Sequence, residues 1–501
     1  MRISLLHVQF HEGNNMFPPL GILYVAGALR EAGHRVQVLD GDPLVETDLA
    51  TRVAAFRPEL IGLSFLTMTC GRAATLAADL RRLLPGVPIM AGGPHATAEP
   101  EDTLTRLGVD VVVRGEGERS AVEIADRVGA GRSLEGLPGC ATPRGRGPDR
   151  APIQDLDTLP LPARDLLDFE RYLAAPGLIR GHASARHASV MAGRGCRYRC
   201  TFCASHLQLG RDLRMRSVPD VIAELHHLVE EYDVRGVYFV DDIFTGDRRW
   251  VRRFCAALAR APFRLEWACQ SRVESVDRGL LEAMRAAGCV QVDFGVESGS
   301  KRVLRRMKKG TTAASVARAF DLAHDVGLRT GASFILGSPD EEASDLDETL
   351  ALARRIRSDW TVFFFSTPYP GTELWHELKQ SGQLDGLPEY GAVWNNRQNQ
   401  TPFDQGPLSP EALAAYRRRA QNQHFSRNYL SPRNLRYAAR LARQAAARPH
   451  LWLEAGRSLL LGGRWDDAVE AWFAEDRARV TAWRPAPGHL GQRARGQALR
   501  S

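Results

Sequence analysis

The sequence predicts an α/β protein with two parallel sheets in succession, followed by a mostly α-helical C-terminal region. Two observations support this fold class. Short apolar runs bounded by turn residues alternate with amphipathic segments over residues 1–130, and the same alternation returns over residues 187–381. In the amphipathic segments the apolar residues recur at helical spacing. Alternating strands and helices favour parallel sheets, because each helix returns the chain to the end of the sheet where the next strand begins.

Residues 1–135 form the first expected domain. Its strands are predicted by five apolar runs: ISLLHV, HRVQVLD, LIGLSF, VPIMAGG and VDVVVRG. Helical segments separate these runs, so the units predict a doubly wound, Rossmann-like sheet, which binds ligands beyond the carboxyl ends of its strands. Those ends carry SFLTMT (64–69), AGGPH (91–95) and RGEGE (114–118), which are rich in glycine and small polar residues.

Residues 136–180 are dense in proline, glycine and charge, and we expect a linker there. Residues 181–384 form the second expected domain, with six strands predicted by HASVMAG, RGVYFVDD, RLEWACQ, VQVDFGVES, RTGASFILG and WTVFFFSTP. Nearly continuous apolar strands in βα units predict a parallel barrel that is incomplete relative to eight units, a partial (β/α)6 barrel. Residues 385–501 consist mainly of helix-forming alanine, arginine and leucine segments, and we expect a helical C-terminal domain.

The charge distribution argues against a nucleic-acid-binding protein. The formal net charge is +7, but residues 411–501 alone contain 17 arginines, no lysine and 7 acidic residues. The rest of the chain is therefore close to neutral, and the basic tail is typical of a helical surface or a partner contact. The chain contains no run of about 18 uncharged apolar residues, so the sequence predicts no membrane span. The start of the chain lacks the apolar core of a secretory signal, so the expected location is the cytoplasm.

Three of the eight cysteines are clustered in RGCRYRCTFCA. Cys196, Cys200 and Cys203 have the spacing C-x3-C-x2-C and follow the first predicted strand of the second domain. Three thiolates on one loop can hold three irons of a four-iron cluster and leave the fourth iron open to another ligand. A structural zinc site needs a fourth ligand, for which His206 is close in sequence. The spacing alone leaves both metals open.

The motif C-x3-C-x-F-C after a strand, at the start of a six-unit βα domain, resembles the radical S-adenosylmethionine (SAM) superfamily. The resemblance implies a [4Fe-4S] cluster on the three cysteines, whose open iron binds SAM for reductive cleavage to a 5′-deoxyadenosyl radical. It places Phe202 beside the adenine. Strand-end motifs FVDDIFTGD, CQSRVE and VDFGVESGS imply further SAM contacts: Asp241 and Asp242 for the amino group, Arg272 for the carboxylate, and Glu297 and Ser298 for the ribose and amino acid part. Taken alone, the two aspartates could equally cap a helix.

Residues 1–380 as a whole resemble the cobalamin-binding class of radical SAM enzymes. The resemblance is carried by PPLGILYVAGALREAGHRVQVLD, LIGLSFLTMT, AGGPHAT and VVRGEGE, together with the cysteine motif. Glycine lets a backbone approach a ligand closely, here the nucleotide tail of cobalamin. The implied cofactor contacts in the first domain are Ser64, Thr67, Gly92, Gly93, His95, Gly115 and Glu116.

One motif departs from the related cobalamin domains that carry D-x-H-x-x-G, whose histidine coordinates cobalt from below. The corresponding QFHEG (9–13) has Gln9 in place of the aspartate and a short glycine spacing. His95 is a substitute candidate for the cobalt ligand, although we expect it to make a polar contact to the cofactor tail. We therefore expect a cobalt without a protein imidazole ligand.

The resemblance implies methyl transfer to an unactivated carbon of a small-molecule substrate of the secondary-metabolite kind, through the 5′-deoxyadenosyl radical and methylcobalamin. The expected partner is an external one-electron reductant of flavodoxin or ferredoxin type, and we expect no nucleic-acid or membrane partner. The alternative is a non-methylating member of the same class that performs oxidative cyclisation or ring rearrangement. A corrinoid or iron–sulfur carrier or sensor is a third interpretation, which the intact cysteine motif and the later strand-end motifs disfavour.

Overall fold

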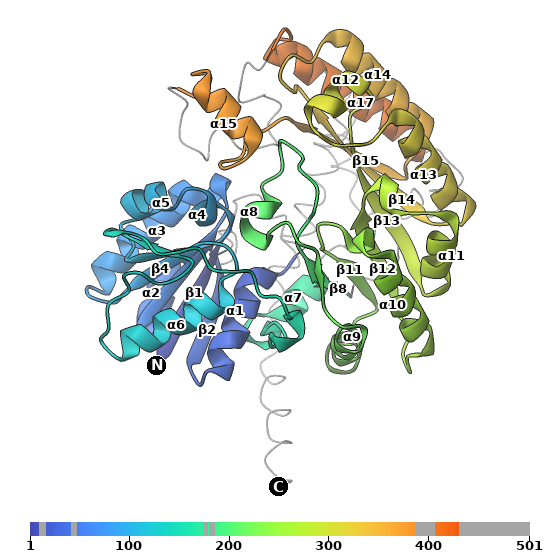
Figure 1. Cartoon of the computed structure of the whole chain (residues 1–501). Helices are drawn as coiled ribbons and strands as arrows, with labels where there is room; N and C mark the ends of the chain where they lie inside the picture. The colour runs from blue at the N-terminus through green and yellow to red at the C-terminus, as the bar shows by residue number, and fades with distance from the viewer. Residues whose placement is uncertain (10–16, 42–47, 175–178, 180–185, 386–405, 430–501) are drawn as a thin grey trace, which may run out of the picture.

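The computed structural model contains two large sheets side by side, each covered by helices (Figure 1). The first comes from the N-terminal part of the chain and the second from the central part, which confirms the predicted fold class. The structure describes residues 1–9, 17–41, 48–174, 179, 186–385 and 406–429. Most of the predicted C-terminal domain lies outside the described residues. Among the helices of the described part, none is long and apolar enough to cross a membrane.

The first sheet has seven strands in the order β2-β1-β3-β4-β5-β6-β7. Its parallel strands match the five predicted runs: β1 (Arg2–Val8), β2 (Arg35–Gly41), β3 (Leu60–Phe65), β4 (Ile89–Gly92) and β5 (Val111–Val113). The connecting helices are α1 (Leu20–Glu31), α2 (Leu49–Phe56), α3 (Cys70–Leu83), α4 (Pro94–Ala98), α5 (Pro100–Leu107) and α6 (Glu118–Gly129). Because β1 lies between β2 and β3, the strand order reverses beside β1. Doubly wound sheets bind ligands at this switch point, beyond the carboxyl ends of the strands.

Part of the segment that we predicted as a linker extends this sheet. Strands β6 (Cys140–Thr142) and β7 (Gly145–Arg146) form a short hairpin, and β6 pairs antiparallel with β5. Strands of three and two residues are too short to produce a periodic apolar signal, and the surrounding proline and glycine obscured them. Further along, the short helix α7 (Phe169–Ala174) packs its apolar side chains into the core of the second sheet. The linker prediction is therefore wrong for these residues.

The second sheet has six parallel strands in the order β15-β14-β13-β12-β11-β8, so the predicted partial barrel is confirmed. The strands are β8 (His187–Val190), β11 (Gly236–Phe239), β12 (Glu266–Ser271), β13 (Cys289–Glu297), β14 (Arg329–Leu336) and β15 (Trp360–Phe365). The helices around it are α9 (Val218–Tyr232), α10 (Arg248–Arg260), α11 (Arg278–Ala286), α12 (Lys301–Arg306), α13 (Ala313–Asp325) and α14 (Ala343–Ile356). The sheet does not close, and β8 and β15 are its two edges.

Smaller elements complete the described part. A two-stranded antiparallel ladder, β9 (Gly193–Arg194) with β10 (Arg214–Met215), and the helix α8 (Ser205–Leu209) lie between the two sheets (Figure 1). After β15 come α15 (Glu373–Gln380) and α17 (Pro410–Tyr429). Leu413 and Ala420 of α17 belong to the apolar core of the second sheet. Where the predicted C-terminal domain is described, it is thus helical and packed on the barrel.

A buried ion-pair network joins the predicted linker to the second domain. Glu224 of α9 is fully buried and accepts hydrogen bonds from Arg164, at 2.6 Å, and from Arg216. Burial alone would raise the pKa of Glu224, but the two guanidinium groups outweigh it and lower this pKa below its usual value. The carboxylate therefore stays ionised, and each buried charge depends on the others.

Replacing Glu224 by glutamine keeps the side-chain shape but leaves two buried guanidinium groups without a countercharge. We expect Glu224→Gln to lower the free energy of unfolding by about 3–5 kcal/mol. Urea unfolding followed by tryptophan fluorescence measures the change. The control is Glu230→Gln on the same helix, whose side chain is 70% exposed, and which should change stability by less than about 0.5 kcal/mol. Equal effects of the two variants would contradict the role of the network.

Candidate active site

The three clustered cysteines lie on the cluster loop, residues 195–204, which joins β9 to α8. Backbone hydrogen bonds attach this loop to the protein at two points. The Cys196 N–H donates to Gly210 O over 3.3 Å, and the Thr201 N–H donates to Met307 O over 3.0 Å. All three cysteines are free and half-buried. The loop is thus anchored on both sides, while its thiols remain accessible to a metal.

The thiol arrangement favours an iron–sulfur cluster over a single zinc ion. Zinc holds sulfur at about 2.3 Å, so its ligand atoms lie within roughly 4 Å of one another. No three of the loop thiols and His206, all of them described residues, have their ligand atoms within 4.8 Å of one another. His206 instead places Nδ1 3.1 Å from the carbonyl oxygen of Cys203. Burial raises the pKa of the Cys203 thiol to about 11, and metal binding would remove that proton.

The two predicted aspartates after β11 have different environments. Asp241 is buried and accepts a 3.1 Å hydrogen bond from the N–H of Ala192, and burial raises its pKa to about 7. Asp242 accepts a hydrogen bond from the Ser205 hydroxyl, but its buried Oδ2 has no hydrogen-bond partner among the described residues. Neither aspartate caps a helix, because Asp247 caps α10. Asp242 therefore keeps one acceptor for a ligand beside the cysteines. Asp241 holds the backbone that leads into the cluster loop through Oδ2, and its Oδ1 likewise has no hydrogen-bond partner among the described residues.

The remaining predicted SAM contacts are largely engaged by the protein itself. Arg272 follows β12 and reaches the cluster loop, and its Nε, Nη1 and Nη2 each have one protein acceptor. Phe202 of that loop is half-buried. Glu297 has φ +70° and pairs with Lys309, with 2.7 Å between Oε1 and Nζ. The buried Ser298 hydroxyl lies 3.0 Å from the Thr349 hydroxyl. The structure thus brings Arg272 to the cluster loop. The polar groups of Glu297 and Ser298 interact with other side chains of the protein instead.

A cavity of about 310 Å³ lies at the carboxyl edge of the first sheet. Its wall includes the predicted residues Ser64, Gly92, Gly93, Gly115 and Glu116. Gly93 has φ +97°, and a β-carbon there would lie 2.8 Å from the Phe65 carbonyl oxygen, so only glycine fits this turn. The opposite wall is contributed by the second domain, through Met191, Arg194, Gln208 and Leu209. The cavity therefore lies between the switch point of the first sheet and the segment that carries the cysteines.

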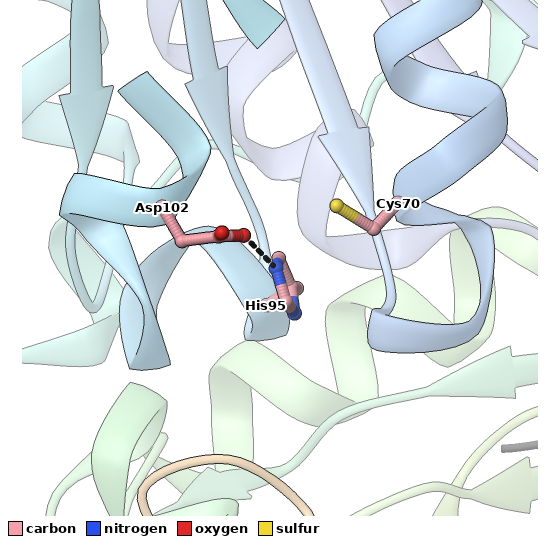
Figure 2. Close-up of side chains that lie close together, drawn as sticks. All are labelled: Cys70, His95 and Asp102. Carbon is pink, nitrogen blue, oxygen red and sulfur yellow. Dashed lines mark ion pairs between the residues drawn. The ribbon is translucent and has the colours of Figure 1, made fainter. Parts of the chain in front are cut away.

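His95 and Thr67 lie away from this cavity. His95 is fully buried, with Nδ1 3.2 Å from the Thr67 hydroxyl and Nε2 3.6 Å from an Asp102 carboxylate oxygen (Figure 2). Cys70 completes a compact group with His95 and Asp102. Neither His95 nor Thr67 is among the residues that line the cavity. A direct contact of His95 with the cofactor tail would require the side chain to move. Among the described residues, the imidazole that lines the cavity is that of His7, with Nδ1 3.1 Å from an Asp40 carboxylate oxygen.

Glu116 lines the cavity but is held by two arginines of the second domain. Arg194 Nη1 donates to Glu116 over 3.0 Å and Arg194 Nη2 donates to Glu118 over 2.6 Å. Arg214 donates to both oxygens of Glu116, each over 3.0 Å. Burial alone would raise the pKa of Glu116, but Arg214 and Arg194 lower it below the usual value. The sequence analysis did not identify these two arginines. The pattern that could have indicated them was one arginine on either side of the cysteine motif and two glutamates after the fifth strand of the first domain.

Two family models match the chain over the two sheets. The model "B12 binding domain" matches residues 8–125, and the model "Radical SAM superfamily" matches residues 190–353. The first range includes most of the cavity wall, and the second includes the cluster loop and most of the partial barrel. Each matched range therefore contains one of the two candidate cofactor sites.

Known proteins resemble the chain over most of its length. An uncharacterized methyltransferase of Pyrococcus horikoshii is 35% identical over 365 residues, which cover 72% of this chain and 78% of the relative. The anaerobic magnesium-protoporphyrin IX monomethyl ester cyclase of Rubrivivax gelatinosus is 28% identical over 445 residues, or 85% and 78% of the two chains. The radical SAM methyltransferase TsrM from Kitasatospora setae, solved with tryptophan and a SAM analogue, has a TM-score of 0.65 at 20% identity and covers 83% of this chain and 82% of that chain. This last likeness shows the same fold.

The two matched domains and the 35% identical relative agree with the motifs and with the fold. The cofactors of this family are a [4Fe-4S] cluster, SAM and cobalamin. Three free thiols on an anchored loop, a buried carboxylate oxygen without a partner beside them, and a glycine-walled cavity fit these groups. The chain belongs to the cobalamin-binding class of radical SAM enzymes.

Proposed function

We propose that this enzyme transfers a methyl group to an unactivated carbon of a small-molecule substrate. The observation that carries the proposal is the composition of the cavity wall. The wall combines the carboxyl edge of the first sheet with Arg194, which stands two residues before Cys196. A cobalamin held there would face the cluster loop, so that one substrate could reach both centres.

Three cofactors supply the chemistry when bound: the cluster and SAM supply a 5′-deoxyadenosyl radical, and cobalamin supplies the methyl group. The residues of the chain bind and orient them. Cys196, Cys200 and Cys203 would hold the cluster, and the oxygen of Asp242 that has no partner among the described residues would accept a hydrogen bond from the SAM amino group. Around the cobalamin, Gly92 and Gly93 admit the backbone to close contact. The substrate is of the secondary-metabolite kind, and a flavodoxin or ferredoxin type protein delivers the electron.

The named relatives support methyl transfer and leave room for one alternative. The 35% identical relative carries a methyltransferase name, and the solved structure TsrM is a methyltransferase. The cyclase of Rubrivivax gelatinosus covers more of this chain, at 28% identity. A non-methylating oxidative cyclisation is therefore the second candidate function. The two candidates use the same cofactors and differ in the fate of the substrate radical.

The cluster assignment predicts a selective loss of iron. Anaerobically reconstituted protein should hold about four irons and four sulfides, and alanine in place of Cys196, Cys200 or Cys203 should remove the cluster, because each thiolate holds one iron. Iron analysis and visible absorbance measure this. Cys255→Ala and Cys140→Ala are matched controls, because both thiols are buried away from the cluster loop. About one zinc per chain without iron–sulfur absorbance would refute the assignment.

The cobalamin assignment predicts separate effects for two neighbouring residues. Gly93→Leu should reduce hydroxocobalamin binding at least tenfold, because a side chain at φ +97° collides with the Phe65 backbone and displaces the cavity wall. Gly108→Leu places the same side chain at another positive φ, +60°, in open space outside the cavity, and should bind normally. His95→Ala should weaken binding without changing the cobalt absorbance spectrum. A spectral change from imidazole-ligated to unligated cobalt would show that His95 is a ligand after all.

The proposed reaction predicts its by-products. Methyl transfer consumes one SAM as methyl donor and one as radical source, so S-adenosylhomocysteine and 5′-deoxyadenosine should form in about equal amounts per product. With trideuteromethyl SAM the product should gain one labelled methyl group, as measured by mass spectrometry on candidate metabolites. Turnover that yields 5′-deoxyadenosine and an unlabelled, dehydrogenated or rearranged product would establish the second candidate function instead.

A further inference from the structure

Arg272 has a position that the SAM-carboxylate prediction does not explain. The residue follows β12 and is 6% exposed. Its guanidinium carbon lies 3.7 Å from the centroid of the Tyr198 ring, in the middle of the cluster loop. Its Nη1 lies 3.6 Å from the sulfur of Cys200. The guanidinium therefore lies directly against one of the three cluster cysteines.

The other donors of Arg272 hold this orientation. Nε donates to a carboxylate oxygen of Glu274 over 3.3 Å, and Nη2 donates to the backbone carbonyl of Lys309. Together with the Tyr198 ring, these contacts fix the plane and the rotation of the guanidinium group. These contacts use three of the five N–H groups and direct one N–H of Nη1 at the sulfur of Cys200.

We propose that Arg272 is a positioning residue that donates a hydrogen bond to the Cys200 sulfur and thereby sets the reduction potential of the cluster. The proposal rests on the proposed function in one respect, namely that Cys200 is a cluster ligand. Hydrogen bonds to cluster sulfurs and nearby charge are the main means by which a protein adjusts an iron–sulfur potential. Reduction by one electron makes the cluster and its thiolates more negative. A buried cation with an N–H aimed at one thiolate stabilises the reduced form and raises the potential.

A raised reduction potential matters for this enzyme because its cluster must be reduced before SAM can be cleaved. An external low-potential donor must supply the electron, and a cluster surrounded by apolar groups alone would be harder to reduce. Low local dielectric strengthens the interaction, because Arg272 is buried and Cys200 is half-buried. The exposed arginines of the cluster loop interact with the cysteines more weakly, because water surrounds them. Arg199, which precedes Cys200 directly, is exposed, so water screens its charge.

The test is a redox titration of the reconstituted full-length enzyme without SAM, monitored by electron paramagnetic resonance of the reduced cluster. Arg272→Met should shift the midpoint potential to more negative values by at least about 59 mV, which is a tenfold change in a one-electron equilibrium constant. Arg272→Lys retains the charge but loses the guanidinium fork, so its shift should be smaller in the same direction. Tyr198→Leu keeps Arg272 but removes the ring against which it stacks, and it should also lower the potential.

Arg199→Met is the matched control, because it removes one positive charge beside the same cysteine without removing a sulfur contact; its potential should stay at the wild-type value. An Arg272→Met cluster with the wild-type potential and a weakened affinity for SAM would overturn the proposal and restore the role in carboxylate binding. Equal shifts in Arg199→Met and Arg272→Met would also overturn it, in favour of a general charge effect. If Arg272→Met assembles no cluster, Tyr198→Leu and Arg272→Lys decide the matter. Absence of a cluster in the wild-type enzyme would instead refute the proposed function.

Discussion

The buried ion pairs of Arg194 are the interaction on which the active site depends. Arg194 stands two residues before Cys196 and pairs with Glu116 and Glu118, which follow β5 of the first sheet. A buried guanidinium is tolerated only while its countercharges stay in place. The pairs therefore tie the carboxyl edge of the first sheet to the start of the cluster loop. Radical chemistry that involves two cofactors needs such a fixed relation, because a misplacement of about 1 Å can cost roughly a hundredfold in rate.

Polar residues in the site divide according to whether the protein already satisfies them. Ser298 and Glu297 make their hydrogen bonds within the fold. Asp242 keeps a buried oxygen without a partner among the described residues. A buried acceptor in this state costs free energy unless a ligand completes it. Oδ1 of Asp241 is in the same state, so each of the two adjacent aspartates contacts the protein through one oxygen and leaves the other open to a ligand.

The elements were predictable from the sequence because their signals are local. The run LIGLSF coincides with β3, and the segment VPDVIAELHHLVEEY coincides with α9. The cysteine motif was local too, since all three thiols fall within eight residues. Side-chain partners were not predictable, because they come from distant positions: Ser298 meets Thr349, 51 residues later, and Arg272 meets the backbone of Lys309, 37 residues later. No rule of sequence spacing predicts these pairs. Arg272 and Ser298 were therefore predicted to contact a cofactor, whereas in the structure they also bind other parts of the protein.

The shared wall of the cavity has a consequence for the biosynthesis of the enzyme. The first domain leaves the ribosome before the second, and domains generally fold as units in that order. At that stage the glycine-rich strand ends offer only an open half of the cavity. Arg194, Gln208 and Leu209 complete it later. The wall of the cavity is therefore complete only after the chain has been synthesised beyond residue 209. The same short segment of the chain, residues 191–209, thus completes the cavity and carries the cluster loop.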